Sequence, residues 1–196
     1  MRDLHDVFGD LAAAEDPVEW ACDNLRMIDR GSAAYVFEHP DDARFVIRIS
    51  DYPDGWFGYA EDTINLEEAG DSSHHRPSVA AITVVSGVFA GIGERLEPIE
   101  DGTWLADAVD AVIRALTTRN GWNKVASLVP GFPGFVAGLE SRLDIRPENF
   151  MRRGDTLVYN DPYSALPYER ERRMRDRYAF GGSDSAVRPP VPPCRP

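Results

Sequence analysis

Three oxygen-bearing side chains occur at close intervals towards the end of the chain. The segment 142–162 reads RLDIRPENFMRRGDTLVYNDP and contains Asp144, Asn149 and Asp161. Strand-forming residues around the turn RRGD separate Asn149 from Asp161, which predicts a short hairpin with these two residues at its ends. The three side chains are either unrelated surface residues or one site that folding brings together.

One site of this composition would suit phosphoryl transfer. A magnesium ion that faces nucleotide phosphates takes one or two protein oxygens and completes its shell with phosphate oxygens and water. Transfer of the kinase type also needs a carboxylate that orients the acceptor hydroxyl beside the metal ligands. A loop Asp-x-x-x-x-Asn followed by a hairpin that returns an Asp supplies all three groups. Arg146 lies two positions after Asp144, where a cation on the acceptor or phosphate side is expected.

The N-terminal half must supply the elements opposite this site. Asp16 and Pro17 predict a helix start, with an inward stripe at Val18, Ala21, Leu25 and Ile28. Apolar and β-branched runs then predict two hairpins, and the stretch between them reads as a helix that ends near Gly70. The expected strands cover 35–37, 45–49, 79–85 and 88–96.

The C-terminal half is expected to be mostly helical before its hairpin. The stretch 103–121 is the clearest amphipathic helix, with Leu105, Val109, Val112 and Leu116 on one side. A second helix is expected from Pro133 to about Arg142, then strands at 149–152 and 156–159. We therefore expect an α+β protein of two lobes. Its parts would be a helical extension (1–26), a β-rich lobe (27–100), a reduced helical lobe (101–165), and a basic helix with a Pro-rich, disordered tail (166–196).

This order of elements resembles the protein kinase fold. LDIRPENFM resembles the kinase catalytic loop, YNDP the metal-binding Asp-Phe-Gly segment, and FVIRI the strand whose lysine contacts the nucleotide phosphates. The chain is also similar to the short serine/threonine kinases that some podoviral phages express early in infection. GSAAY and NFMRRGDTLVYNDPYS carry this second resemblance, which covers roughly residues 27–165.

The resemblance implies a role for each matching residue. Asp144 would be the catalytic base with Arg146 beside it, and Asn149 and Asp161 would hold Mg²⁺. The ATP phosphates would face Gly31, Ser32 and Arg48, with Glu61, or else Glu67, as the acid that pairs with Arg48.

Three features depart from the family pattern. Arg48 stands where kinases have lysine, and a planar guanidinium is not equivalent to an ammonium at a tight phosphate site. The phosphate loop has one glycine, Gly31, and Pro162 replaces the usual phenylalanine after Asp161. The large helical lobe and activation segment of the family have no counterpart in the remaining residues.

Two classes of function follow from these features. The first is ATP- and Mg²⁺-dependent transfer of phosphate to Ser/Thr of host proteins during phage infection. The second is a catalytically weak or inactive kinase-like module that inhibits a host factor by binding it. Residues 163–196 carry seven Arg against four acids, so the net charge of −12 leaves −15 on residues 1–162. Such a charge favours basic, nucleic-acid-associated host proteins as partners over nucleic acid itself.

The compartment follows from what the sequence lacks. There is no run of 18 or more apolar residues, and the first 20 residues carry acids where a secretion signal has its apolar core. We therefore expect a protein of the host-cell cytoplasm without membrane contact.

Overall fold

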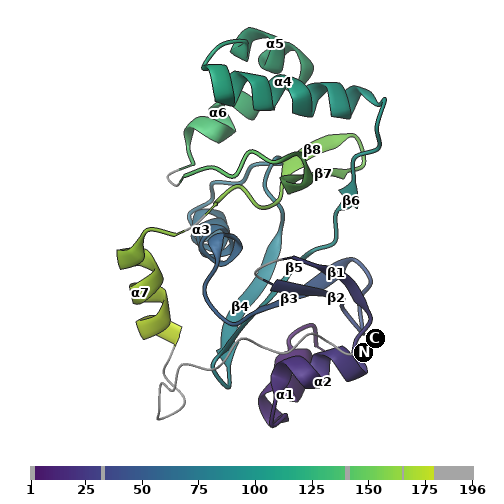
Figure 1. The fold of residues 1–196 in the computed structure, drawn as a ribbon, viewed down its shortest axis with the longest axis vertical. Coiled ribbons are helices and arrows are strands. Elements are labelled where there is room, and N and C mark those ends of the chain that lie inside the picture. The colour runs from purple at the N-terminus through teal and green to yellow at the C-terminus, as the bar shows by residue number, and fades with distance from the viewer. Residues whose placement is uncertain (1–2, 32–33, 140–141, 165, 179–196) are drawn as a thin grey trace.

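The computed structural model describes residues 3–31, 34–139, 142–164 and 166–178. Within them the chain forms an α+β fold, with a five-stranded antiparallel sheet at one end and a helical group at the other (Figure 1). The predicted α+β class and antiparallel sheet are confirmed. No helix of the described residues is long and apolar enough to cross a membrane.

The five-stranded sheet is built from the two predicted hairpins and one additional edge strand. Its order is β1-β2-β3-β5-β4, with every neighbouring pair antiparallel. Arg48 lies in the middle of this sheet, opposite Val36 on one side and Gly91 on the other. The strands are β1 (Met27–Arg30), β2 (Ala34–Glu38), β3 (Phe45–Ser50), β4 (Val79–Val85) and β5 (Val88–Glu94).

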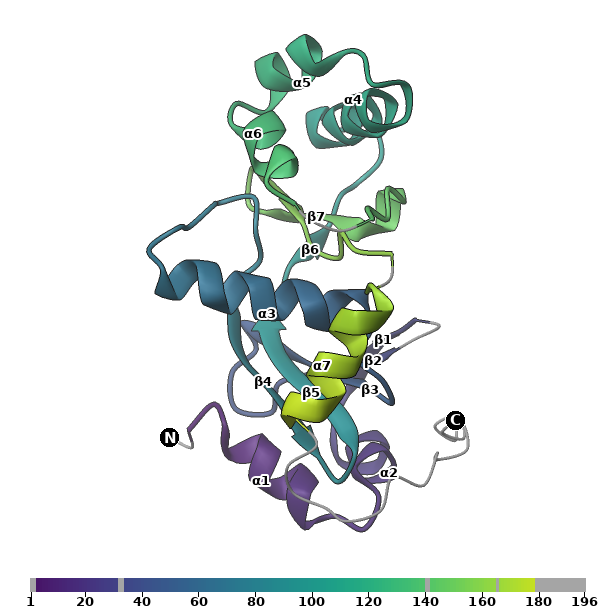
Figure 2. The ribbon, with the colours of Figure 1, turned by 90° about the vertical axis from the view of Figure 1, so that its left-hand side faces the viewer.

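Two layers of helix cover the two faces of this sheet. Helices α1 (Asp6–Ala13) and α2 (Pro17–Asn24) share a core with Ile47 and Ile49, which point to one face. Helix α3 (Gly55–Glu68) packs through Trp56 on the other face (Figure 2). Because successive side chains of a strand alternate between faces, Arg48 points to the α3 side.

The helix predicted after Asp16 begins as expected but ends earlier. Asp16 accepts hydrogen bonds from the backbone N–H groups of Val18 and Glu19, and Pro17 is the first helical residue. The helix stops at Asn24, and Ile28 lies in β1 as an exposed strand residue. The predicted inward position of Ile28 is therefore wrong, because pairing with β2 takes this stretch into the sheet.

The helical group has its own core, which α4 organises. Helix α4 (Trp104–Thr118) buries Leu105, Val109 and Val112 as predicted, whereas Leu116 is only partly buried. Helix α5 (Trp122–Leu128) was not expected, and α6 (Phe132–Ala137) is shorter than expected because Gly138 ends it. Beneath these helices lie the 3-10 turn η1 (Pro147–Asn149) and the sheet of β6 (Glu97–Pro98), β7 (Phe150–Arg153) and β8 (Thr156–Tyr159).

Hydrogen bonds join the two groups of elements across their boundary. Arg153 of β7 donates to the Glu94 carboxylate on β5 and to the carbonyls of His74 and Arg76, both at 3.0 Å. The His75 ring lies 2.9 Å from the carbonyl of Leu157 on β8. These contacts fix the β7–β8 hairpin beside the five-stranded sheet, where the site forms.

The last described helix, α7 (Tyr168–Tyr178), packs against α3 (Figures 1 and 2). The charged sequence predicted a helix here, and that is confirmed. It is not simply a solvated helix, because Met174 is only 2% exposed among Trp56, Phe57 and Phe89.

Candidate nucleotide and phosphoryl-transfer site

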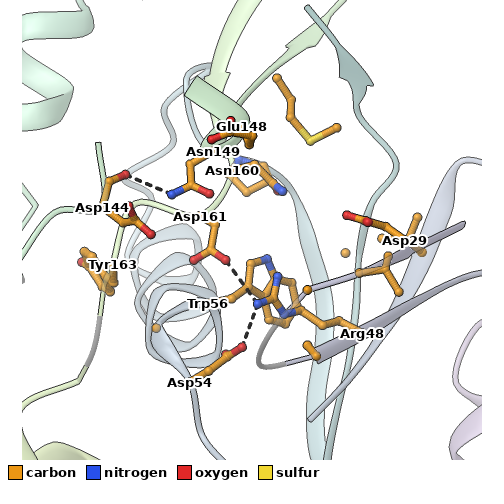
Figure 3. Close-up of a pocket in the computed structure, with 18 of the residues that line it drawn as sticks. Asp29, Arg48, Asp54, Trp56, Asp144, Glu148, Asn149, Asn160, Asp161 and Tyr163 are labelled. Atoms are coloured by element: carbon orange, nitrogen blue, oxygen red, sulfur yellow. Dashed lines mark hydrogen bonds and ion pairs between the residues drawn. The ribbon is translucent and has the colours of Figure 1, made fainter. Parts of the chain in front are cut away.

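A cavity of about 560 Å³ opens between the five-stranded sheet and the β7–β8 hairpin. Asp144, Asn149 and Asp161 all line it, together with Arg48 (Figure 3). The three oxygen-bearing side chains are therefore not unrelated surface residues, because folding brings them into one cavity.

One side of the cavity is apolar. Apolar side chains of the first three strands line it together with Met151 of β7 and Leu96 of the connection between the two sheets, and we call this set the apolar slot, which suits a flat, largely apolar ring. Alternation along β2 predicts that Ala34 and Val36 share a face, but it does not indicate that this face borders a cavity. These slot residues were missed from the sequence: Ile28, Ala34, Val36, Val46, Leu96 and Met151.

Arg48 provides the cation of the cavity. Its Nη2 lies 2.7 Å from Asp54 Oδ2 and 3.2 Å from Asp161 Oδ2, and its guanidinium carbon lies 5.3 Å from the Trp56 ring centroid. Burial lowers the pKa of Arg48, but the two carboxylates outweigh this and hold the pKa above its usual value. The Arg48 Nε has no hydrogen-bond acceptor among the described residues.

The predicted partner of Arg48 was wrong. Arg48 pairs with Asp54, which is 6% exposed, rather than with Glu61 or Glu67. Asp54 is the N-cap of α3, accepting a hydrogen bond from Phe57 N at 3.0 Å, so it lies at the helix end nearest β3. Glu61 instead turns towards α7, where it pairs with arginines of that helix at 2.6 and 3.4 Å. Helical periodicity on α3 could not show this, because the partner precedes the helix.

The predicted catalytic loop is held in place through its backbone. Asp144 N donates to Pro162 O at 2.7 Å, and the Asp144 carbonyl accepts from Asn149 Nδ2 at 3.0 Å and Tyr159 Oη at 2.6 Å. These bonds tie the loop to the segment that follows β8. Because the Asn149 amide nitrogen is used in this way, its Oδ1 is the atom left for a ligand in the cavity.

Arg146 binds the carboxylate of Asp144 directly. Its Nε lies 3.0 Å from both carboxylate oxygens, and its Nη2 lies 2.7 Å from Oδ2. Burial raises the pKa of Asp144, but hydrogen bonds from Arg146 and Asn149 outweigh burial and bring the pKa below its usual value. Asp144 is therefore a paired carboxylate, and an acceptor hydroxyl would have to share it with Arg146.

Asp161 has the opposite electrostatic character. Burial raises its pKa to about 6; Arg48 lowers the pKa, and Asp54 and Asp144 raise it further. The carboxylate lies between Asn149 and Arg48 in the cavity (Figure 3). The hairpin brings it there, since Asn160 N donates to Asn149 O at 2.8 Å and closes the base of the β7–β8 pair.

The described residues include only part of the predicted phosphate loop. Gly31 lines the cavity, and its N–H donates to Ala34 O at 2.9 Å. Ser32 lies outside the described residues. The positions of both as phosphate contacts stay predictions.

The described residues contain no group of three or more His, Cys, Asp or Glu arranged to hold a metal by themselves. Mg²⁺ beside a polyphosphate needs fewer, and Asn149 Oδ1 with the Asp161 carboxylate is an oxygen pair of the required kind. The charge of the cavity also suits a bound cation, because its described lining has seven carboxylates and three guanidiniums. A nucleotide polyphosphate would be repelled by this lining unless bound cations neutralised it.

Comparisons with known proteins add little to this geometry. No family model matches the sequence, and no curated protein matches it. Among solved structures, aminoglycoside phosphotransferase APH(4)-Ia, a ternary complex with AMP-PNP and hygromycin B, is similar at 17% identity and a TM-score of 0.33, over 54% of this chain and 33% of that one. A crystal structure of a kinase domain is similar at 12% identity and a TM-score of 0.36, over 69% and 39%. The chain thus spans about a third of the length of these structures, and TM-scores of this size carry no argument about activity.

Proposed function

We propose that this protein transfers the γ-phosphoryl group of ATP to a hydroxyl group. The observation that carries the proposal is the cavity itself, in which Asp144, Asn149, Asp161 and Arg48 meet beside an apolar slot. The resemblance to protein kinases, and to the early kinases of podoviral phages, supports Ser/Thr hydroxyls of host proteins as acceptors.

Each side chain of the cavity would have a separate role in this reaction. The apolar slot would hold the adenine ring, and Arg48 would bind phosphate oxygens while Asp54 and Trp56 keep its guanidinium in place. Asn149 and Asp161 would hold Mg²⁺, which neutralises the charge on the phosphates when bound. Asp144 would orient the acceptor hydroxyl and take its proton.

Protonation states in the metal-free protein suit these roles. The lowered pKa of Asp144 keeps it ionised and able to accept a hydrogen bond at neutral pH. Arg146 beside it balances the negative charge that Asp144 brings to the acceptor side. The orientation of the acceptor would therefore depend on a carboxylate that Nε and Nη2 of Arg146 already hold.

A second candidate is a kinase-like module that acts by binding. The observation that favours it is that Arg48 pairs with Asp161 and Arg146 pairs with Asp144, so that both cations proposed for the reaction are bound to carboxylates of the site itself. Together with the charge of −15 on residues 1–162, this would suit an acidic inhibitor of a basic host factor.

Incubation with γ-labelled ATP, Mg²⁺ and a host lysate separates the two candidates. Asp144→Asn should lower phosphate transfer by about 10²–10⁴-fold while nucleotide affinity stays nearly intact. Asp155→Asn, an exposed acid in the β7–β8 turn, is the matched control and should transfer as the wild type does. A wild-type protein that transfers no label, with Asp144→Asn still fully effective on the host, would exclude the enzyme and leave the binding module.

A further inference from the structure

The segment that follows Asp161 is docked onto α3. Tyr163 is 4% exposed, its ring lies 5.4 Å from that of Tyr59, and its hydroxyl donates to Asp62 Oδ2 at 2.9 Å. The backbone approaches so closely that a Cβ on Gly55 would lie 1.9 Å from Tyr163 O. The position of Asp161, two residues earlier, therefore depends on this contact with the helix.

Helix α7 binds the same acid of α3. Arg170 donates to both carboxylate oxygens of Asp62, at 2.6 and 3.0 Å, and to Gly58 O at 2.6 Å. Leu166 occupies the space beside Gly58, where a Cβ would lie 2.1 Å from its Cδ2. Paired guanidinium–carboxylate bonds of this kind are strong and directional. Asp62 thus joins α7 to the segment after Asp161.

An apolar contact leads from α7 to the cation of the cavity. Met174 packs in one cluster with Trp56, and the Trp56 ring lies over the Arg48 guanidinium. Trp56 and the N-cap Asp54 belong to the start of α3, where the backbone of Tyr163 lies against Gly55. Helix α7 crosses the same end of α3 (Figure 2). Two elements of the cavity, Arg48 and Asp161, are therefore supported from α7.

We infer that α7 is a positioning element of the site, and that Arg170, Asp62 and Tyr163 form a latch that holds Asp161 at the metal position. This inference rests on the proposed function. Through the latch, the partly buried Asp62 helps to order a short segment that is also bound to residues 142–144 by Pro162 O and by the backbone and hydroxyl of Ser164. Arg170 and Asp62 do not line the cavity, and Tyr163, which does line it, has its hydroxyl bound to Asp62, so we expect the latch to act through Asp161.

Calorimetric titration with AMP-PNP, with and without Mg²⁺, tests the latch. Tyr163→Phe keeps the ring but removes the hydroxyl, and Arg170→Gln removes the charge from Asp62. Both variants should reduce the gain in affinity that Mg²⁺ confers by about 3–10-fold, the loss expected for one or two hydrogen bonds. The affinity measured without Mg²⁺ should stay as in the wild type. Arg172→Gln, on the exposed side of α7, is the matched control and should change neither value.

A second measurement does not depend on nucleotide binding. Asp144 N–H donates to Pro162 O, within the latched segment, so its hydrogen exchange reports whether that segment is ordered. Exchange should be at least about 10-fold faster in Arg170→Gln than in Arg172→Gln at equal global stability. Unchanged exchange together with an unchanged Mg²⁺ effect would overturn the latch. If wild type binds no AMP-PNP, the proposed function fails, and the exchange rates alone then decide for or against the latch.

Discussion

Replacing Asp161 by Asn should stabilise the metal-free protein at neutral pH while it damages the site. Burial raises the pKa of Asp161 to about 6, and Arg48 only partly offsets this. In the unfolded chain the same carboxyl has its ordinary pKa of 3.8. The folded chain therefore binds more protons than the unfolded chain between these values, and its stability falls as the pH rises from about 4 through 6.

The size of the effect follows from the two pKa values. A difference of about two pKa units makes an ionised Asp161 cost about 3 kcal/mol of unfolding free energy at pH 8. The cost is only about 1 kcal/mol at pH 4.5, where the folded side chain is protonated. Asn has the same shape and no charge, and Arg48 keeps its closer partner Asp54 at 2.7 Å. The gain in Asp161→Asn should thus be larger at pH 8 than at pH 4.5 by about 2 kcal/mol.

Urea unfolding in the presence of EDTA, at pH 4.5 and pH 8, measures this difference. Asp144→Asn is the control of opposite sign, because Arg146 and Asn149 bring the pKa of Asp144 below its usual value despite burial. It should lose stability to a similar extent at pH 8 and pH 4.5, because the loss shrinks only below the ordinary pKa of 3.8, as the pH falls through the lowered pKa. An Asp161→Asn protein that is less stable than wild type at pH 8, or equally more stable at both pH values, would refute the reasoning.

Three further results are expected. Calorimetry with AMP-PNP and Mg²⁺ should show a larger loss of affinity for Asp161→Asn than for Asn149→Ala, because only the former removes a charge that faces the ion; equal losses would count against Asp161 as a ligand. Arg48→Lys should weaken nucleotide binding, since a lysine cannot reproduce both the carboxylate bridge and the stacking on Trp56; equal or tighter binding would show that the pocket is indifferent to the guanidinium. Burial lowers the pKa of His75 despite its two carbonyl contacts, so stability should fall as the pH drops below about 6.5, and thermal melts of His75→Asn should lack this slope.

The sequence by itself predicted most of the local elements and showed the close spacing of the three oxygen-bearing residues. Apolar and β-branched runs predicted the hairpins, Asp16 and Pro17 marked a helix start, and the apolar stripe of 103–121 indicated α4. The site could be recognised because Asp144, Asn149 and Asp161 lie within 18 residues around one hairpin. Short loops and paired strands return their ends to the same place, so contacts at short sequence separation follow from local rules.

Only the tertiary structure shows which side chains of distant elements contact one another. Periodicity shows which face of α3 is polar, but the partner of Arg48 is the cap that precedes the helix, and Glu61 faces a helix more than 100 residues away. The same holds for the apolar slot, whose members come from four strands and one connection. The charged segment 168–178 docks onto α3 because partly buried acids of that helix pair with its arginines and because Met174 enters the core beside it. Such pairings depend on the summed geometry of the fold, which no local pattern encodes.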